Sequence, residues 1–257
     1  MTVLTELLDR TIVIRAKPDL VFRYFTDSAR WAAWWGQGSS IDARRGGAMK
    51  IRYPDGTEAV GEVVDVEPPS RIVFTYGYAS GTLIPPGGSR VTIEVEPHRD
   101  GTLVTLQHQF ADAPTRDQHV QGWRYQLSLF SNVVVNELHA NAAELVDAWF
   151  AAWATTDDDE RKRMLRNIVA ANVTFRDPYS TVDGLDELHA QIGGAIRFMR
   201  GVRLHRAGTV RHCQGTVLSD WTATGMGPDG QAQATGTNVF VLGADGLITS
   251  AVGIWNR

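Results

Sequence analysis

Three tryptophans stand close together in the segment RWAAWWGQG, at positions 31, 34 and 35. Their i, i+3 and i+4 spacing places all three rings on one face of a helix. Indole rings are large, and a buried ring nitrogen needs a hydrogen-bond partner. Such a cluster is typical of a packed core, of a surface platform for a base or a sugar, or of the wall of a ligand pocket.

Single aspartate, histidine and tyrosine residues are the other candidates for chemistry. Asp177, in the segment RDP, suits a turn or cap because a proline follows it, or a general base if its carboxylate faces apolar surroundings. Tyr76, Tyr78 and His108 carry polar tips that need partners when buried, either within the core or from a ligand. The seven histidines show no HExxH spacing, so no metal is expected, and no motif predicts a cofactor.

Composition is that of an ordinary globular protein, with 43% hydrophobic and 21% charged residues in 257. A net charge of −4 argues against nucleic acid or an anionic membrane as a partner. The eight tryptophans are about twice the usual frequency. A single cysteine, Cys213, and an N-terminus without signal-peptide features predict a cytoplasmic protein.

The first elements that position these residues are short strands interrupted by two helices. Pro18 suits the first turn of a helix, and Gly36 suits the end of the next one. The expected helices are 18–27 and 28–35, and the expected strands are 11–16, 48–53, 57–67, 71–78, 89–97 and 101–110.

From about residue 115, apolar residues recur at helical spacing over more than fifty residues, which we divide into three helices near 137–141 and 155–160. Asp229-Gly230 and Asp245-Gly246 mark later hairpin turns. A strand is expected at 173–178, a helix at 184–199, and strands at 202–213, 216–226, 231–243 and 247–255. This order predicts an α+β protein of two domains, 1–138 and 139–257, each a curved antiparallel sheet packed on helices.

The first half resembles the activator of heat-shock protein 90 ATPase homologue family, within the START-like (SRPBCC) helix-grip superfamily. The motifs that carry the resemblance are PDLVF, WWG, VEPPSRIVFTY, LVTLQHQF and GWRYQLSLF, in that order. The resemblance implies an antiparallel sheet that grips a long C-terminal helix, with an apolar cavity between them. It implies ligand contacts from Trp35, Tyr76, Tyr78, His108 and Trp123. Trp31 and Trp34 are then expected to lie mostly in the core, and Trp35 nearest to a ligand.

The second half resembles the SnoaL-like branch of the nuclear transport factor 2-like superfamily. The segments ELVDAWFAAWATTD, VTFRDPYSTVDGLDELHAQI, DWTATG and GTNVFVLGADGLITSAVGIW carry it. The resemblance implies a cone-shaped curved sheet packed on helices around an apolar pocket. Members include polyketide cyclases and ketosteroid isomerases, and Asp177 stands where the isomerases carry their general base. Ligand contacts are expected from Trp149, Trp153, Tyr179, Trp221 and Asn238.

Two departures from the isomerase pattern disfavour steroid isomerisation. The first helix offers tryptophan and phenylalanine where the isomerases have a tyrosine, and the late strand offers Thr235, Thr237 and Asn238 but no acid. The leading hypothesis is a protein that binds small hydrophobic or aromatic molecules, with cyclase-like or isomerase-like activity through Asp177. The alternative is a non-enzymatic interaction module of the co-chaperone or stress-response kind. A homodimer through the C-terminal domain is expected from resemblance alone.

Overall fold

A computed structural model of the chain describes residues 3–225 and 234–256. The backbone divides into two units, Met1–Val135 and Asn136–Arg257. We call the first unit the N-terminal domain and the second the C-terminal domain. The hairpin turn expected at Asp229-Gly230 lies outside the described residues.

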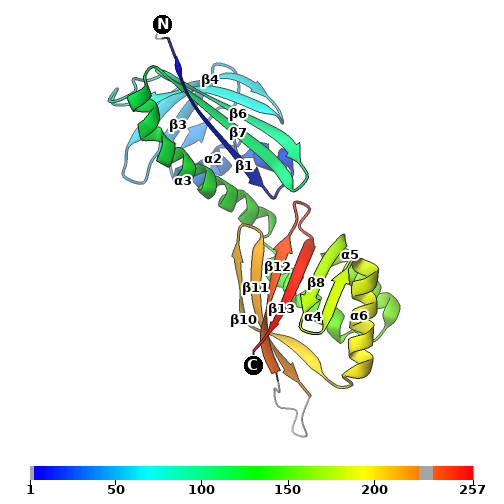
Figure 1. Cartoon of the computed structure of the whole chain (residues 1–257). Coiled ribbons are helices and arrows are strands. Elements are labelled where there is room, and N and C mark those ends of the chain that lie inside the picture. Colours follow the sequence, from blue (N-terminus) through cyan, green and yellow to red (C-terminus); the bar gives the residue numbers. More distant parts are fainter. Residues whose placement is uncertain (1–2, 226–233, 257) are drawn as a thin grey trace. The chain divides into compact units, whose positions relative to one another are not determined.

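The N-terminal domain is built on a seven-stranded antiparallel sheet with the order β1-β7-β6-β5-β4-β3-β2. Figure 1 shows this sheet with the long helix α3, in green, running along one side of it. Burial alternates along β7, so alternate side chains face the core. The strands are β1 (Glu6–Ile14), β2 (Ser40–Ile41), β3 (Ala48–Arg52), β4 (Glu58–Glu67), β5 (Arg71–Tyr78), β6 (Ser89–His98) and β7 (Gly101–Phe110).

Two short helices and one long helix complete this domain. The carboxylate of Asp27 accepts a hydrogen bond from the backbone N–H of Arg30 at 2.9 Å, which caps the second helix. Gly36 ends that helix with a φ of +129°, and a Cβ there would lie 2.5 Å from the backbone carbonyl oxygen of Arg52. Only glycine fits this turn. The helices are α1 (Pro18–Arg23), α2 (Ser28–Trp35) and α3 (Ala113–Leu138).

A stripe of buried side chains on α3 joins the sheet and the short helices into one core. The ring of Phe130 lies 5.0 Å from that of Phe25 and 4.8 Å from that of Trp34. The side-chain amide of Gln126 donates a hydrogen bond to the backbone carbonyl of Trp34, at the end of α2. The other buried residues of the stripe include Trp123, Leu127, Val134 and Val135. The helix-grip arrangement expected of this half is therefore confirmed.

The C-terminal domain has a six-stranded sheet with the order β10-β11-β12-β13-β8-β9. It is mixed rather than wholly antiparallel, because β13 pairs with β8 in the parallel direction. A helix and four strands separate these two strands in the chain, so no hairpin forces them to be antiparallel. The strands are β8 (Val169–Asp177), β9 (Ser180–Asp183), β10 (Arg203–Cys213), β11 (Thr216–Thr224), β12 (Ala234–Leu242) and β13 (Ile248–Trp255).

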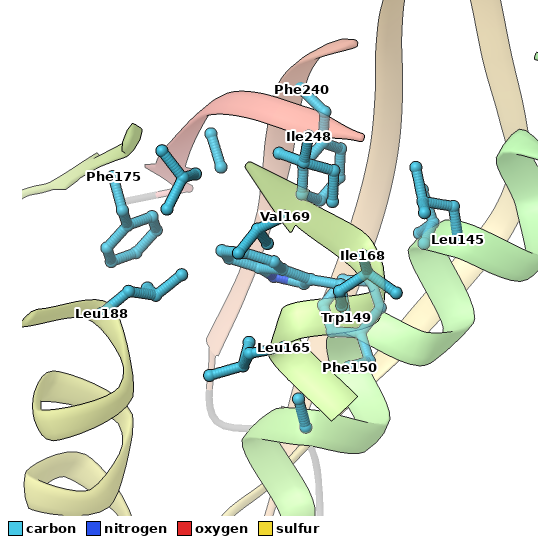
Figure 2. Close-up of a cluster of buried hydrophobic side chains, with 14 of the residues drawn as sticks. Leu145, Trp149, Phe150, Leu165, Ile168, Val169, Phe175, Leu188, Phe240 and Ile248 are labelled. Carbon is cyan, nitrogen blue, oxygen red and sulfur yellow. The ribbon is translucent and has the colours of Figure 1, made fainter. Parts of the chain in front are cut away.

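Three helices bury the inner face of this sheet. Figure 2 shows the indole of Trp149, on the first of them, at the centre of a cluster that includes Phe240 and Val169. Trp149 is 1% exposed, and its ring lies 5.4 Å from that of Phe240 and 5.8 Å from that of Phe175. The helices are α4 (Ala142–Ala154), α5 (Asp158–Ile168) and α6 (Leu185–Phe198). The α+β class and the two sheet-and-helix domains are confirmed.

The element boundaries differ from the expected ones where local patterns are weak. β8 begins at Val169, directly after α5, and the short strands β2 and β9 have no alternating pattern long enough to predict them. The breaks between the three central helices fall at the expected segments. Among the residues that the structure describes, no helix combines the length and hydropathy needed to cross a membrane.

Candidate functional site

A pocket of about 420 Å³ lies in the C-terminal domain. Its floor comes from neighbouring strands of the sheet, and its walls come from α4 and α6. Aromatic and aliphatic side chains make up most of this lining. Its aromatic residues are Trp149, Phe150, Trp153, Phe175, Tyr179, Phe198, Trp221 and Trp255.

Asp177 and Asn238 bring polar atoms into this apolar space. Asp177 ends β8 and is half-buried, and its carboxylate accepts a hydrogen bond from the backbone N–H of Tyr179 at 2.8 Å. Asn238 is 7% exposed, and its side-chain amide makes no hydrogen bond to another described residue. A Cβ placed on Gly253 would lie 3.3 Å from both the Asn238 Oδ1 and the Asp177 Cβ. The bare backbone of Gly253 therefore leaves open the space between these two side chains.

Three aromatic rings form a sequence that leads from solvent into this pocket. The ring of Tyr179, which is 77% exposed, lies 5.3 Å from that of Trp255, edge to face. The ring of Trp255 lies 5.0 Å from that of Trp221, which is 4% exposed. Phe198, at the end of α6, also lines the pocket and is 92% exposed. Exposed aromatic rings beside an apolar pocket favour a flat, apolar ligand.

The polar groups of this pocket suit proton transfer better than metal binding. A carboxylate takes up a proton, and a neutral amide donates a hydrogen bond to an oxygen that gains charge. Ser180 and Gln191 also line the pocket, but the Gln191 amide donates to the Ser180 hydroxyl at 2.7 Å. Within residues 3–225 and 234–256, no three His, Cys, Asp or Glu side chains converge as metal ligands.

A second pocket, of about 490 Å³, lies in the N-terminal domain between the sheet, α2 and α3. No residue of its lining is an aspartate, glutamate, lysine or arginine. Trp34 and Trp35 lie in the wall with their ring centres 4.4 Å apart, whereas Trp31 packs in the core behind them. The polar side chains of the wall are Tyr53, Tyr76, Tyr78, His108, Gln118, His119, Tyr125 and Gln126, together with the indoles of Trp34, Trp35 and Trp123.

Two hydrogen-bonded pairs and a ring contact bring three of the tyrosines together with a histidine. The hydroxyls of Tyr53 and Tyr76 lie 3.0 Å apart, and the rings of Tyr76 and Tyr78 lie 5.7 Å apart, edge to face. The Nδ1 of His119 lies 2.8 Å from the backbone carbonyl of Thr115 and donates to it, so its Nε2 accepts. The Tyr78 hydroxyl donates to that Nε2 at 3.4 Å. We call these four side chains, Tyr53, Tyr76, Tyr78 and His119, the tyrosine–histidine cluster.

His108 is held in a different, fully satisfied network. The indole N–H of Trp123 donates to the His108 Nδ1 at 2.9 Å. The opposite nitrogen, Nε2, therefore carries the proton and donates to the Ser89 hydroxyl at 2.8 Å. Ser89 in turn donates to the backbone carbonyl of Tyr76 at 2.9 Å. His108 is thus a core histidine that joins α3 to the sheet, with no ring nitrogen left for a substrate.

Burial keeps two tyrosines and two histidines of this pocket uncharged at neutral pH. It raises the pKa of Tyr53 to about 12 and raises the pKa of Tyr76 further. Burial also lowers the pKa of His108 well below the ordinary histidine value, and the neighbouring His119 lowers it further. The pKa of His119 is itself lowered, again chiefly by burial. These two phenols and two imidazoles are therefore neutral hydrogen-bonding groups.

The depressed pKa of His108 predicts that the N-terminal domain loses stability in mild acid. Below pH 6.5 the unfolded chain binds a proton at this histidine and the folded chain does not, so unfolding becomes easier as the pH falls. We expect the free energy of unfolding to be about 1 kcal/mol lower at pH 5.5 than at pH 7.5 from this group. Urea titrations at both pH values measure it.

A pair of variants isolates the contribution of His108. His108→Gln is expected to be less stable at both pH values but to show a smaller difference between them. His98→Gln, at the half-buried end of β6, is the matched control and is expected to keep the full difference. An unchanged pH difference in His108→Gln would contradict the assignment.

Two family models match the chain in sequence. Residues 15–134 match the model described as Activator of Hsp90 ATPase homolog 1-like protein, and residues 146–251 match the SnoaL-like domain. The N-terminal domain is Hsp90-activator-like, and the C-terminal domain is SnoaL-like. Both resemblances expected from the sequence motifs are confirmed. No protein of curated function matches the chain.

Solved structures similar to parts of this chain come from several bacteria. One is from Agrobacterium tumefaciens and is named as a candidate isomerase of the SnoaL-like family. It is 26% identical in sequence, with a TM-score of 0.43, and the match covers 47% of this chain and 99% of the Agrobacterium chain. CalU16 from Micromonospora echinospora shares 25% identity and a TM-score of 0.40 over 49% and 70%. The Aha1 dimer from Colwellia psychrerythraea shares 17% identity and a TM-score of 0.42 over 48% and 91%.

The structure places every residue predicted to bind a ligand in the lining of a pocket. The Hsp90-activator-like pocket contains Trp35, Tyr76, Tyr78, His108 and Trp123. The SnoaL-like pocket contains Asp177, Trp149, Trp153, Tyr179, Trp221 and Asn238. Their contact with a ligand stays a prediction. Trp34, expected to lie mostly in the core, is 1% exposed and also borders the pocket of the Hsp90-activator-like domain.

Several pocket residues were not predicted, although two of them carry a signal in the sequence. His119 lies four residues before Trp123, on the helical face that the apolar spacing already marks. Gly253 interrupts an alternating strand, which indicates a close approach of backbone or ligand. Tyr53 has no such signal, because only the pairing of β3 and β4 with β5 brings it to Tyr76.

Proposed function

We propose that the SnoaL-like domain binds a small, flat, mostly apolar molecule that carries a carbonyl group. We further propose that Asp177 moves a proton on the carbon beside that carbonyl. One observation carries the proposal: in a pocket walled by apolar rings, a carboxylate and a buried, unbonded amide both adjoin the open space above Gly253.

The proposed reaction needs only groups that line this pocket. The Asp177 carboxylate takes a proton from the carbon, and the electron pair left behind moves onto the carbonyl oxygen. The amide N–H of Asn238 donates a hydrogen bond to that oxygen as its charge grows. Return of the proton to the same carbon exchanges it, and return to another carbon isomerises the molecule.

The strength of the donor limits the class of substrate. A neutral amide stabilises a developing oxyanion less than a phenol or a protonated acid does. The substrate therefore needs a proton that is already acidic, on a carbon between two carbonyls or between a carbonyl and an aromatic ring. Polycarbonyl chains have such carbons, which supports a cyclase-like role over isomerisation of steroids.

Binding of 2-tetralone, an aromatic ketone of this class, tests the proposal. In ¹⁵N-labelled protein, 2-tetralone is expected to shift the indole N–H signals of Trp221 and Trp255. Asn238→Leu removes the hydrogen bond at nearly constant volume and is expected to weaken binding about threefold to tenfold. Gly253→Val fills the space between Asp177 and Asn238 and is expected to abolish the shifts.

A leucine at an exposed asparagine of the same domain is the matched control. Asn172→Leu, on β8 but exposed, is expected to keep wild-type affinity. Equal affinity of the wild type and Asn238→Leu, or shifts unaffected in Gly253→Val, would overturn the binding mode.

We also infer a reducing compartment such as the cytoplasm, which the single exposed, free Cys213 supports. A homodimer through the SnoaL-like domain stays a prediction, which light scattering on the full chain tests.

A further inference from the structure

The charge of this protein is distributed unevenly along the chain. Residues 188–219 contain five arginines and no aspartate or glutamate, although the whole chain has a net charge of −4. This segment covers most of α6, all of β10 and the start of β11. At physiological salt, charges more than about 8 Å apart are largely screened from one another, so a partner responds to the local charge. The net charge, which argues against an anionic partner, therefore does not describe this surface.

Two of the five arginines are held in ion pairs within the domain. The Nε of Arg206 lies 2.6 Å from the Asp147 carboxylate, and a terminal nitrogen of Arg211 lies 3.1 Å from that of Asp220. The other three are exposed, and no carboxylate in the part of the chain that the structure describes forms an ion pair with them. They are Arg197, Arg200 and Arg203. Their guanidinium groups are therefore available to an anion outside the protein.

The most exposed large apolar side chain that the structure describes lies among these three arginines. Phe198, the last residue of α6, is 92% exposed. Tyr179, between β8 and β9, is 77% exposed. Covering these rings with a partner would remove apolar surface from water. Exposed aromatic rings close to arginines are typical of proteins that dock on the headgroup region of a lipid surface.

Both rings lie at the SnoaL-like pocket, and the arginines alternate with residues that line it. Tyr179, Phe198, Met199 and Val202 all belong to this lining. We call Tyr179 and residues 197–203 the entrance patch. It combines apolar rings with unpaired positive charges beside an apolar pocket. An apolar ligand dissolves in lipid more readily than in water, so a lipid surface would bring such a ligand directly to this pocket.

A lipid surface fits the entrance patch better than a folded protein or a nucleic acid does. A stable protein interface takes about 20 to 30 residues from each side, and the entrance patch is much smaller. A nucleic acid duplex offers phosphates to the arginines but no apolar phase to the Phe198 ring. An anionic lipid surface offers both, because its headgroups attract the guanidinium groups and its acyl boundary accepts the rings.

We propose that the entrance patch docks the SnoaL-like domain reversibly on an anionic lipid surface. The three arginines contact the headgroups, and the rings of Phe198 and Tyr179 enter the boundary between headgroups and acyl chains. Docking places the pocket against the lipid. The proposal does not rest on the chemistry assigned to Asp177, because lipid binding is measured without a ligand in the pocket.

Sedimentation of the full chain with vesicles tests the proposal. One set of vesicles is pure phosphatidylcholine, and the other contains equal parts of phosphatidylcholine and phosphatidylglycerol. The protein is expected to bind the anionic vesicles about tenfold to 100-fold more tightly than the neutral ones. Raising the salt to about 1 M shortens the screening length to about 3 Å and is expected to remove most of this preference.

Charge variants identify the arginines that carry the binding. The combined substitutions Arg197→Gln, Arg200→Gln and Arg203→Gln are expected to weaken binding to anionic vesicles about tenfold to 100-fold, and Arg200→Gln alone about threefold to fivefold. Arg45→Gln is the matched control, because Arg45 is exposed and unpaired among the described residues of the other domain. It is expected to bind as the wild type does.

A pair of aromatic variants tests the insertion of the rings. Phe198→Ser is expected to weaken binding to anionic vesicles about threefold to tenfold. Tyr125→Ser, which removes a ring that is 68% exposed on α3, is the matched control and is expected to leave binding unchanged. An unchanged indole N–H signal of Trp149 shows that the core of the SnoaL-like domain is intact in each variant.

Four results would overturn the proposal. These are equal binding to the two sets of vesicles, wild-type binding by the triple arginine variant, wild-type binding by Phe198→Ser, and an equal loss in Arg45→Gln and Arg200→Gln. Heparin that binds as tightly as the anionic vesicles, with no loss in Phe198→Ser, would assign the patch to polyanions in general and would also overturn it. Because the 2-tetralone test uses no lipid, failure of either proposal is distinguishable from failure of the other.

Discussion

Asp177→Asn is expected to slow proton exchange at the acidic carbon of 2-tetralone by about 100- to 10,000-fold. An amide cannot take up the proton that a carboxylate accepts. The fold at this point is expected to persist, because an asparagine oxygen still accepts the hydrogen bond from the backbone N–H of Tyr179. Incorporation of deuterium from heavy water, followed by NMR, measures the rate.

The affinity of this variant separates chemistry from binding. If Asp177 acts as the base, 2-tetralone binds the variant within about threefold of the wild-type affinity while exchange is lost. Asp245→Asn is the matched control, because Asp245 accepts a similar turn hydrogen bond from Leu247 at 3.1 Å outside the pocket. Equal exchange rates in the wild type and in Asp177→Asn would contradict the role of Asp177.

Trp34→Ala is expected to destabilise the Hsp90-activator-like domain by about 3 to 5 kcal/mol. Trp34 is 1% exposed, and its ring packs against those of Phe25 and Phe130 at 5.9 and 4.8 Å. Truncation removes these contacts and leaves a cavity between α2 and α3. Urea unfolding is followed by NMR. The indole N–H signal of Trp123 reports on this domain, and the indole N–H signal of Trp149 reports on the SnoaL-like domain.

Two further variants provide a comparison for the loss of stability expected in Trp34→Ala. Tyr125→Ala removes a ring that is 68% exposed and is expected to change stability by less than about 1 kcal/mol. Trp34→Phe keeps part of the ring contact and is expected to fall between the two. If the urea midpoint of the Trp123 indole signal is the same in Trp34→Ala as in the wild type, the tryptophan cluster does not hold the core together.

The periodicity of the sequence predicted the elements that carry the pockets because each pattern records burial along a single element. Strand alternation over 101–110 matches β7, where every second residue is buried. Helical spacing likewise marked Trp123 and Leu127 on the buried face of α3. Polar partners such as Ser89, which accepts from His108, lie on other strands and left no local signal.

The sequence by itself determined the order of the longer elements, several of their turns, and the two families to which the halves are similar. Asp27 caps the start of α2 by accepting a hydrogen bond from the backbone N–H of Arg30, and the N–H of Gly36 donates to the carbonyl of Ala32 at its end. The motifs that resemble the two families are likewise short stretches whose order the chain already sets.

Only the tertiary structure decided which side chains meet. The parallel pairing of β13 with β8 places Gly253 beside Asp177, and the register of β12 on β13 sets Asn238 opposite Gly253. In the same way, sheet pairing brings Tyr53 to Tyr76 in the wall of the N-terminal pocket. Sheet register and helix packing are set by burial summed over the whole domain, and local periodicity does not contain that sum.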